Sequence, residues 1–367
     1  MRWLDGPFLE FKRYINRPCL RLVKHSFQCY PMLRSFYRLG SKFIAKTGIP
    51  QLFHRLAYRD QLTVIMYHGI IKEPLIIEDW CFIDEHSFHL QIEYLKRYFE
   101  IVSLSEGVRR MGRGEIKRPT AVITFDDGYQ NNFDVAFPIL WEEGIPATIF
   151  LTTGLINTDD TVWYGRVNLA LSKTQRTHIE WNGFKFDLSR SDLKAKASTA
   201  IQESLKKLEH PKLMAAIRRM TSELGDDPDC SIAMDSPFRM LDKKAIGEMA
   251  ASGLIEFGAH THHHSILSHL SDGERENEIR QSTDAVYELT GQPCKYFAYP
   301  NGRAEDYNSK TIQDLKTCGI QIAVTTISGP NDRRTPVMEL RRYGIGADLP
   351  MAEFQLMVHH FVNRIFG

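Results

Sequence analysis

Two clusters of chemically competent side chains occur in this sequence of 367 residues. The stretch GAHTHHHSIL holds four histidines within five residues, of which His260 and His264 are spaced i and i+4. The stretch ITFDDGY places two acids, Asp126 and Asp127, directly after an apolar run. One carboxylate with two imidazoles leaves coordination positions open for water and substrate, as in a hydrolytic Zn²⁺ centre. The second acid then stays free to act as a base on that water.

Each cluster alone would be weak evidence for a metal site. Paired acids often begin turns or cap helices, and a histidine run can be a surface loop or an expression tag. This run, however, lies deep in the chain behind the apolar segment LIEFGA and is interrupted by a threonine. We therefore expect the two clusters to complete one another in a single site.

The sequence from 61 to 350 supplies elements that can bring these side chains together. Apolar, β-branched runs of strand type alternate with segments of helical periodicity. This alternation predicts an α/β fold with a parallel sheet, either open or closed into a barrel. The chemical residues follow the predicted strands, at the carboxyl ends where α/β barrels build their sites. The predicted strands lie in LTVIMYHG, PTAVITFDDG, PATIFLTT, LIEFGAH, KYFAYP and IQIAVTT.

One segment, at about 158–238, interrupts this alternation and predicts an inserted α+β subdomain. It contains a hairpin pattern, THIEWNGFKFDLS, in which Asn182 and Gly183 indicate a type I′ turn. A charged helical stretch follows. The insertion is either solvated decoration or a wall of the substrate groove, with Trp163 and Tyr164 as candidates for stacking on a sugar.

At this point the sequence resembles a known family. TFDDGY, HTHHH followed by SIL, and FAYPNG, in that order, are similar to the motifs of the polysaccharide deacetylases, the NodB-homology or carbohydrate esterase family 4 enzymes. AVTT after the CGI turn also fits the late strand of that family. The resemblance spans roughly 61–350 apart from the insertion. It implies an irregular (β/α) barrel and the metal-dependent removal of an N- or O-acetyl group from a sugar.

The resemblance also implies roles for individual residues. Asp126 matches the base, Asp127, His260 and His264 match the metal ligands, and the intervening histidines fall on variable positions of the motif. Zn²⁺ is the default ion, although this ligand set also accepts Co²⁺, Ni²⁺ or Fe²⁺. Four residues within or beside the motifs are expected to bind substrate: Tyr129, Tyr299, Pro300 and Asn301. A backbone N–H near Pro300 and Asn301 is expected to hold the oxyanion.

The chain departs from the family pattern in its third motif. Many members carry an arginine there that pairs with the base, whereas this chain has Ala298 in FAYPNG. Another cation must therefore pair with the base Asp126. Arg342 in LRRYG, after a predicted strand, is the first candidate. Arg341 and Arg303 are less favoured, and any of the three could be a surface arginine.

The expected proton donor is also displaced in the sequence. No Leu-x-His motif appears after residue 320, but His68 ends the first predicted strand in VIMYHGI. This order is similar to that of the poly-N-acetylglucosamine deacetylases, in which the acid histidine precedes TFDDG. A barrel closes on itself, so a first strand can occupy the place usually filled by the last. The alternative is a histidine buried in the core.

The ends of the chain differ from its middle. Residues 1–60 carry 12 Lys/Arg against 3 Asp/Glu, interleaved with aromatic and aliphatic residues. This basic amphipathic segment either packs on the catalytic domain or holds the enzyme on an anionic membrane surface. Residues 351–367 form an apolar helical stretch. We expect a catalytic domain over 61–350 between these two segments.

Composition excludes several classes of protein. A net charge of +1 argues against a nucleic-acid partner, and no apolar run approaches the length of a transmembrane helix. The six cysteines are scattered, without framework spacing, and no signal-peptide pattern follows the first positive charge. We therefore expect a cytoplasmic enzyme, peripheral at the inner membrane face if the basic segment binds lipid. Its substrate would then be an N-acetylated saccharide, lipid-linked or close to the membrane.

Two rival functions remain open from the sequence. One is a hydrolase of non-sugar C–N bonds on the same scaffold. The other is a catalytically dead glycan-binding protein, against which the intact set of acids and histidines argues.

Overall fold

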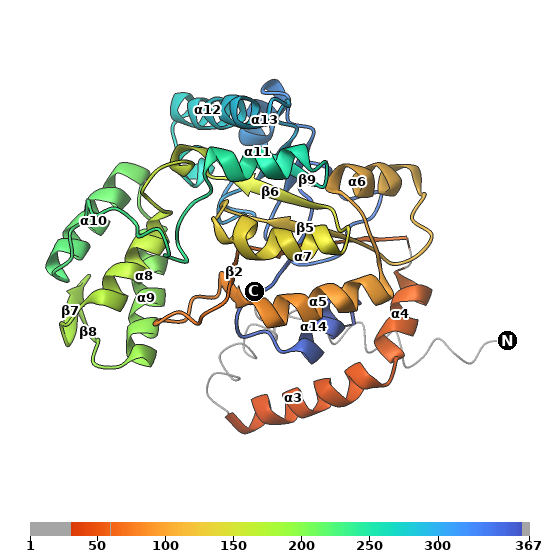
Figure 1. The fold of residues 1–367 in the computed structure, drawn as a ribbon, viewed down its shortest axis with the longest axis horizontal. Coiled ribbons are helices and arrows are strands. Elements are labelled where there is room, and N and C mark those ends of the chain that lie inside the picture. The colour runs from red at the N-terminus through yellow and green to blue at the C-terminus, as the bar shows by residue number, and fades with distance from the viewer. Residues whose placement is uncertain (1–30, 59, 362–367) are drawn as a thin grey trace. The chain divides into compact units, whose positions relative to one another are not determined.

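The computed structural model describes residues 31–58 and 60–361 (Figure 1). Half of the predicted basic segment, residues 1–30, lies outside the described residues. The described residues fall into two compact units: 31–58 together with 350–361, and 60–349.

The larger unit is built on buried parallel strands. Every residue of β1, β5 and β6 is buried, which matches their continuous apolar sequences and a sheet covered on both faces. The strands are β1 (Leu62–Tyr67), β2 (Gly69–Ile71), β3 (Phe82–Asp84), β4 (Glu100–Ile101), β5 (Thr120–Phe125), β6 (Ala147–Leu151), β7 (His178–Trp181), β8 (Phe184–Asp187), β9 (Ile255–Ala259), β10 (Tyr296–Ala298), β11 (Ile322–Val324) and β12 (Tyr343–Gly344).

The central sheet has eight strands in the described chain, in the order β11-β10-β9-β6-β5-β1-β12, with β4 beside β5. An irregular segment joins its two ends. Leu340 forms a parallel bridge with Val324 at the end of β11, and Tyr343 of β12 pairs with Ile65 of β1. The segment 340–344 therefore lies between the last and first strands and closes an irregular barrel, as the family resemblance implies.

Helices cover this sheet (Figure 1). Several begin and end at the expected signals: α12 starts with a capping box of Ser271 and Glu274 and ends at Gly291, whose φ is 71°. The helices of the larger unit are α5 (Glu85–Tyr98), α6 (Leu104–Arg113), the π-helix η1 (Asn132–Ala136), α7 (Phe137–Glu142), the 3₁₀ turn η2 (Thr153–Leu155), α8 (Trp163–Lys173), α9 (Ser191–Leu205), α10 (His210–Glu223), α11 (Lys243–Ala251), the 3₁₀ turn η3 (Leu267–His269), α12 (Asp272–Thr290) and α13 (Ser309–Thr317).

The insertion contains α8, α9, α10 and the hairpin β7–β8, coloured green to one side of the sheet in Figure 1. The hairpin pairs Trp181 with Phe184, and both turn residues have positive φ, which confirms the type I′ signal. The insertion is not mere decoration, because its apolar side chains share one buried core with Phe82 of β3 and Tyr129.

The smaller unit contains α3 (Pro31–Lys46), α4 (Ile49–Ala57) and α14 (Met351–Val358). The C-terminal helix belongs with the N-terminal helices, and the Nδ1 atoms of His54 and His359 lie 3.1 Å apart. Both N-terminal helices carry large exposed apolar side chains: Leu39 and Phe43 on α3, and Ile49, Leu52 and Leu56 on α4. In the part of the chain that the structure describes, every helix is too short or too polar to cross a bilayer.

Candidate active site

The chemical side chains follow the carboxyl ends of β1, β5 and β9, three parallel strands of the central sheet. His68 follows β1, while Asp126 and Asp127 follow β5, and Tyr67 of β1 pairs with Phe125 of β5 in register. The histidine therefore lies beside the two acids. His260 follows β9 in the same way.

Three side chains are arranged as ligands for a metal ion. The Oδ1 atom of Asp127 lies 3.6 Å from Nε2 of His260 and 3.3 Å from Nε2 of His264. One ligand atom from each of these residues lies within 4.8 Å of the others. The same Oδ1 is buried and accepts no hydrogen bond within the described structure. A buried carboxylate oxygen left facing two imidazole nitrogens fits a divalent cation.

The His260 ring is fixed in the tautomer that a ligand needs. Its Nδ1–H donates to the carbonyl of Ala298, 2.7 Å away, so the lone pair of Nε2 faces Asp127. Burial lowers the pKa of His260 to about 4 and keeps the ring neutral. Ala298, which replaces the usual arginine of the motif, thus contributes its backbone.

The turn that carries His264, the second candidate histidine ligand, is strained and anchored. Thr261 and His264 have φ of 62° and 58°, and Asp127 has 72°, a conformation that costs energy in residues other than glycine. Glu278 of α12 holds the turn, because its carboxylate accepts the backbone N–H groups of His262 and His263 and the ring of His263. Both intervening histidines therefore orient the turn, and His263 is also exposed to solvent.

Arg342 is the cation that meets the candidate base. Its Nη1 and Nη2 donate to the two carboxylate oxygens of Asp126, each at 2.7 Å, and both side chains are buried. Burial would raise the pKa of Asp126, but Arg342 and the nearby imidazoles outweigh it and hold that pKa below its usual range. Arg341 and Arg303 are exposed. The segment that closes the barrel therefore carries the arginine that faces Asp126.

His68 faces the acid pair from β1. Its Nε2 lies 4.0 Å from Oδ2 of Asp127, and its Nδ1 has no hydrogen-bond partner in the described chain. The ring contacts Trp80 edge-on, at 4.9 Å between centroids. Trp80 is 49% exposed and gives the site an apolar surface that sequence reasoning missed, because nothing in the pattern around it marks a site.

The structure does not support sugar stacking by Trp163 and Tyr164. Each is only 7% exposed, because α8 packs them into the core that the insertion shares with β3. Tyr129 and Tyr299 are also buried, and the Tyr299 hydroxyl donates to the carbonyl of Met338 at 2.9 Å. These four aromatic rings therefore present no face to a substrate.

The motif residues after β10 form a turn at the sheet edge. Pro300 is buried and Asn301 half-buried, with φ of 59° at Asn301. The Asn301 side chain donates to Oδ2 of Asp306 at 2.6 Å, and its carbonyl accepts the Thr326 hydroxyl at 2.7 Å. These two hydrogen bonds anchor the turn whose backbone N–H is the expected oxyanion donor.

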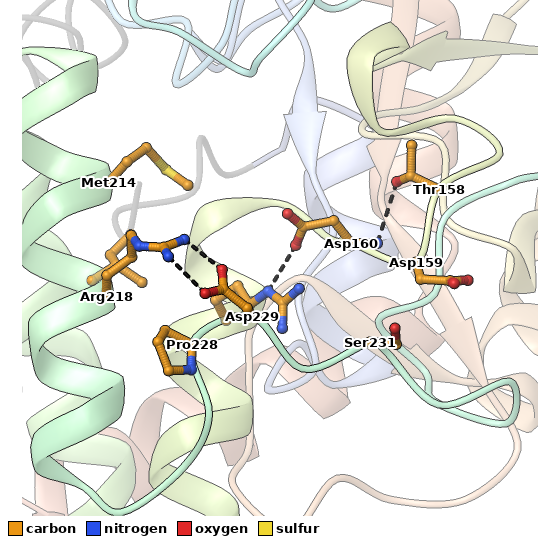
Figure 2. Close-up of a pocket in the computed structure, with 10 residues that line it drawn as sticks. Thr158, Asp159, Asp160, Met214, Arg218, Pro228, Asp229 and Ser231 are labelled. Atoms are coloured by element: carbon orange, nitrogen blue, oxygen red, sulfur yellow. Dashed lines mark hydrogen bonds and ion pairs between the residues drawn. The ribbon is translucent and has the colours of Figure 1, made fainter.

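A surface hollow of about 240 Å³ lies elsewhere, between the insertion helices and the loop after α10 (Figure 2). Both of its arginines are paired with acids: Arg218 binds both oxygens of Asp229 at 2.6 and 2.7 Å, and Arg166 binds Asp160 at 2.7 Å. None of the residues predicted for catalysis lines this hollow.

Comparison with known proteins places the chain. The polysaccharide deacetylase family model matches residues 113–323, and this protein belongs to that family. The expected family is therefore confirmed.

One curated relative is the poly-beta-1,6-N-acetyl-D-glucosamine N-deacetylase of Staphylococcus epidermidis, which is 28% identical over 156 residues. That match covers 42% of this chain and 52% of the relative, so the chain spans about half the length of the curated protein that it matches.

Solved structures share the fold. The Streptococcus pyogenes deacetylase PplD, in complex with acetate, has a TM-score of 0.54 and 19% identity, covering 81% of this chain and 98% of that one. IcaB from Ammonifex degensii has a TM-score of 0.52 and 19% identity, covering 82% and 97%. The expected irregular (β/α) barrel of the NodB type is confirmed by these likenesses.

Proposed function

We propose that this protein is a metal-dependent deacetylase that hydrolyses N-acetyl groups of a saccharide. The observation that carries the proposal is the single site in which Asp127, His260 and His264 converge beside Asp126, with an unpartnered carboxylate oxygen facing the two imidazoles. Asp127, His260 and His264 would bind the ion, and Asp126 would remain free to act as the base that a hydrolytic centre requires.

Each protein group has a separate task in this reaction. A divalent ion, Zn²⁺ by default from the ligand set, would supply Lewis-acid chemistry towards water and the acetyl carbonyl. Asp126, kept ionised by Arg342, takes the proton from the attacking water. His68, across the site, donates a proton to the leaving amine. A backbone N–H of the Pro300–Asn301 turn holds the oxyanion.

The substrate class is inferred from the family and from the relative. The Staphylococcus epidermidis protein is named for poly-beta-1,6-N-acetyl-D-glucosamine, and we propose an N-acetylated saccharide of exopolysaccharide or glycan biosynthesis for this chain. The same chemistry would also hydrolyse O-acetyl groups, so the test must include O-acetylated sugars.

Acetate release by the purified full chain tests this function. N-acetylhexosamine oligomers should release acetate, a chelator should stop the release, and Zn²⁺ should restore it, with Asp126→Asn as the control for contaminating activity. Parallel arms with O-acetyl sugars, followed by acetate release, and with cyclic imides and purine-type substrates, followed by detection of the ring-opened product, separate the alternatives. Hydrolysis of non-sugar substrates alone, or glycan binding without acetate release, would overturn the proposal.

We also propose that the basic segment 1–60, with the C-terminal segment 351–367 that contains α14, is an accessory element to the catalytic domain 61–350 and its insertion at about 158–238. The helix expected over 351–367 ends at Val358 in the described structure. On α3, Leu39 and Phe43 are exposed at helical spacing, with Arg38 and Lys42 beside them. Phe43 is 74% exposed. Apolar side chains interleaved with cations suit an anionic membrane surface.

The second described helix repeats this pattern. Ile49, Leu52 and Leu56 of α4 are exposed at i, i+3 and i+7, with Arg55 beside them. Leu56 is 75% exposed. Each basic residue near an anionic surface contributes roughly 1 kcal/mol, and apolar insertion adds to that. The substrate would then be a lipid-linked or membrane-proximal N-acetyl sugar.

Sedimentation with phosphatidylserine-containing vesicles tests the membrane proposal in the full chain. Wild type should sediment at low salt and be released by high salt, whereas Phe43→Ser with Leu56→Ser should stay in the supernatant. Phe184→Ser is the matched control, because Phe184 is 70% exposed on the insertion hairpin. Equal sedimentation of all three proteins, or of none, would contradict membrane binding by this surface.

A further inference from the structure

A chain of two tyrosine hydroxyls ends on the candidate metal ligand Asp127. The Tyr164 hydroxyl donates to Oδ2 of Asp127, and the Tyr129 hydroxyl donates to the Tyr164 oxygen at 2.9 Å. Tyr164 lies in α8 of the insertion, and Tyr129 in the turn after β5. The insertion thus reaches the metal centre through a side chain that sequence analysis assigns to sugar stacking.

The two oxygens of Asp127 have different surroundings. Oδ1 faces the Nε2 atoms of His264 and His260 at 3.3 and 3.6 Å and accepts no hydrogen bond in the described structure. Oδ2 receives the Tyr164 hydroxyl. A partial rotation of the carboxylate about its Cβ–Cγ bond would move the accepting oxygen away from the hydroxyl and break that hydrogen bond. The hydroxyl therefore holds the carboxylate at the angle at which its other oxygen faces the imidazoles.

The hydroxyls do not serve simple packing. Tyr164 and Tyr129 belong to the apolar core of the insertion, where phenylalanine would bury a ring of almost the same shape. A buried hydroxyl is costly unless it is hydrogen-bonded. Both hydroxyls meet this condition, because Tyr129 donates to Tyr164 and Tyr164 donates to Asp127.

We propose that Tyr164 is a positioning residue of the metal centre, whose hydroxyl holds the Asp127 carboxylate with a single oxygen directed at the ion, and that Tyr129 fixes that hydroxyl. The inference rests on the proposed metal site. It gives the insertion a role in the centre itself: α8 supplies the hydrogen bond that orients one ligand. Removing such a partner typically weakens metal binding about 10- to 100-fold.

Zn²⁺ affinity of the full chain, measured by competition with a chromogenic chelator, tests this without reference to activity. Tyr164→Phe should bind Zn²⁺ about 10- to 100-fold more weakly than wild type. Tyr129→Phe should show a smaller loss in the same direction, and the double variant should be no worse than Tyr164→Phe. The matched control is Tyr67→Phe, because the buried Tyr67 hydroxyl donates to Gln91 at 2.9 Å, away from the ligands.

The possible outcomes separate the inference from the function on which it rests. If wild type binds no metal, the metal site itself fails. If wild type binds Zn²⁺ and the Tyr164→Phe and Tyr129→Phe variants bind it equally well, only the positioning role fails. Thermal unfolding of the metal-free proteins checks folding. If Tyr164→Phe is unfolded, Tyr129→Phe decides: its unchanged affinity overturns the proposal, and its weakened affinity supports it.

Discussion

Arg342 and Asp126 lie 216 residues apart in the chain and meet in a buried, bidentate ion pair with both N–O distances at 2.7 Å. The arginine also donates to the carbonyl of Thr325 at 2.8 Å and to the Thr124 hydroxyl at 3.2 Å. The pair fastens the segment that closes the barrel to the end of β5, so one contact serves both the fold and the candidate base.

Replacing Arg342 with Gln should therefore affect stability and the pH profile together. An uncompensated buried carboxylate costs about 3–5 kcal/mol. Because Arg342 holds the pKa of Asp126 below its usual range, its loss raises that pKa, and the acidic limb of kcat/KM moves to higher pH. Denaturant unfolding and pH–rate profiles measure the two effects. Arg341→Gln, at an exposed neighbour, is the control, and an equal effect of both variants would refute the pairing role.

The same pair should make folding sensitive to acid. The pKa of Asp126 is lower in the folded state than in the unfolded chain. Its contribution to stability is therefore complete above the carboxyl's ordinary pKa and is lost as the pH falls through the folded-state value. Arg342→Gln should lose this stabilising contribution.

Metal content should distinguish the histidines of the HTHHH run. Asp127→Ala and His264→Ala each remove a ligand and should abolish stoichiometric metal binding and acetate release. His262→Ala should keep most of both, because its ring is hydrogen-bonded to Thr153 at 2.9 Å rather than directed at Asp127. Elemental analysis after dialysis measures the content. Equal metal loss in the His262 and His264 variants would contradict the ligand assignment.

His68→Ala should slow turnover without changing metal content. A general acid must carry a proton to act, so a rate that depends on one falls at alkaline pH. The variant has no such group, and the alkaline limb of its rate profile should flatten. Rates across pH, with metal content measured alongside, test this. An unaltered alkaline limb would assign the proton donation to another residue.

Burial of His260 should make the metal-free protein less stable in mild acid. Its pKa is lowered from 6.5 to about 4 by burial, so the folded state takes up this proton less readily than the unfolded chain. The stability is complete above about pH 6.5 and is lost as the pH falls towards 4, by up to about 3 kcal/mol. Denaturant midpoints at several pH values should show a shallower dependence for His260→Gln. An unchanged slope would rule out this contribution.

The sequence predicts the sheet and much of the site for a physical reason. Parallel strands are buried on both faces, so β1, β5 and β6 are continuous apolar runs, and polar residues directly after them must lie at one edge. The sequence pattern does not decide between Arg341 and Arg342, because both lie on an irregular segment without strand or helix periodicity. In the structure Arg341 is exposed and Arg342 is buried. Only the bridges at Leu340 and Tyr343 decide which arginine faces inward.

The aromatic residues of the insertion could not be assigned from sequence. Trp163 and Tyr164 are adjacent aromatic residues of the kind that stack on sugars. The tertiary packing of α8 nevertheless buries both rings and directs the Tyr164 hydroxyl to Asp127. Trp80, in contrast, remains half-exposed beside His68. Which face of an aromatic ring meets solvent depends on contacts between segments distant in sequence, and no local pattern carries that information.

A metal titration of the apoprotein with acetate release as the readout tests the central claim most directly. For wild type, the rate of acetate release from an N-acetylhexosamine oligomer should rise with added Zn²⁺ and reach a plateau at about one ion per chain, as a single three-ligand site requires. Asp126→Asn should bind the same ion and release no acetate, because only the base is lost. Release that is independent of metal, or near-normal turnover in Asp126→Asn, would contradict the account.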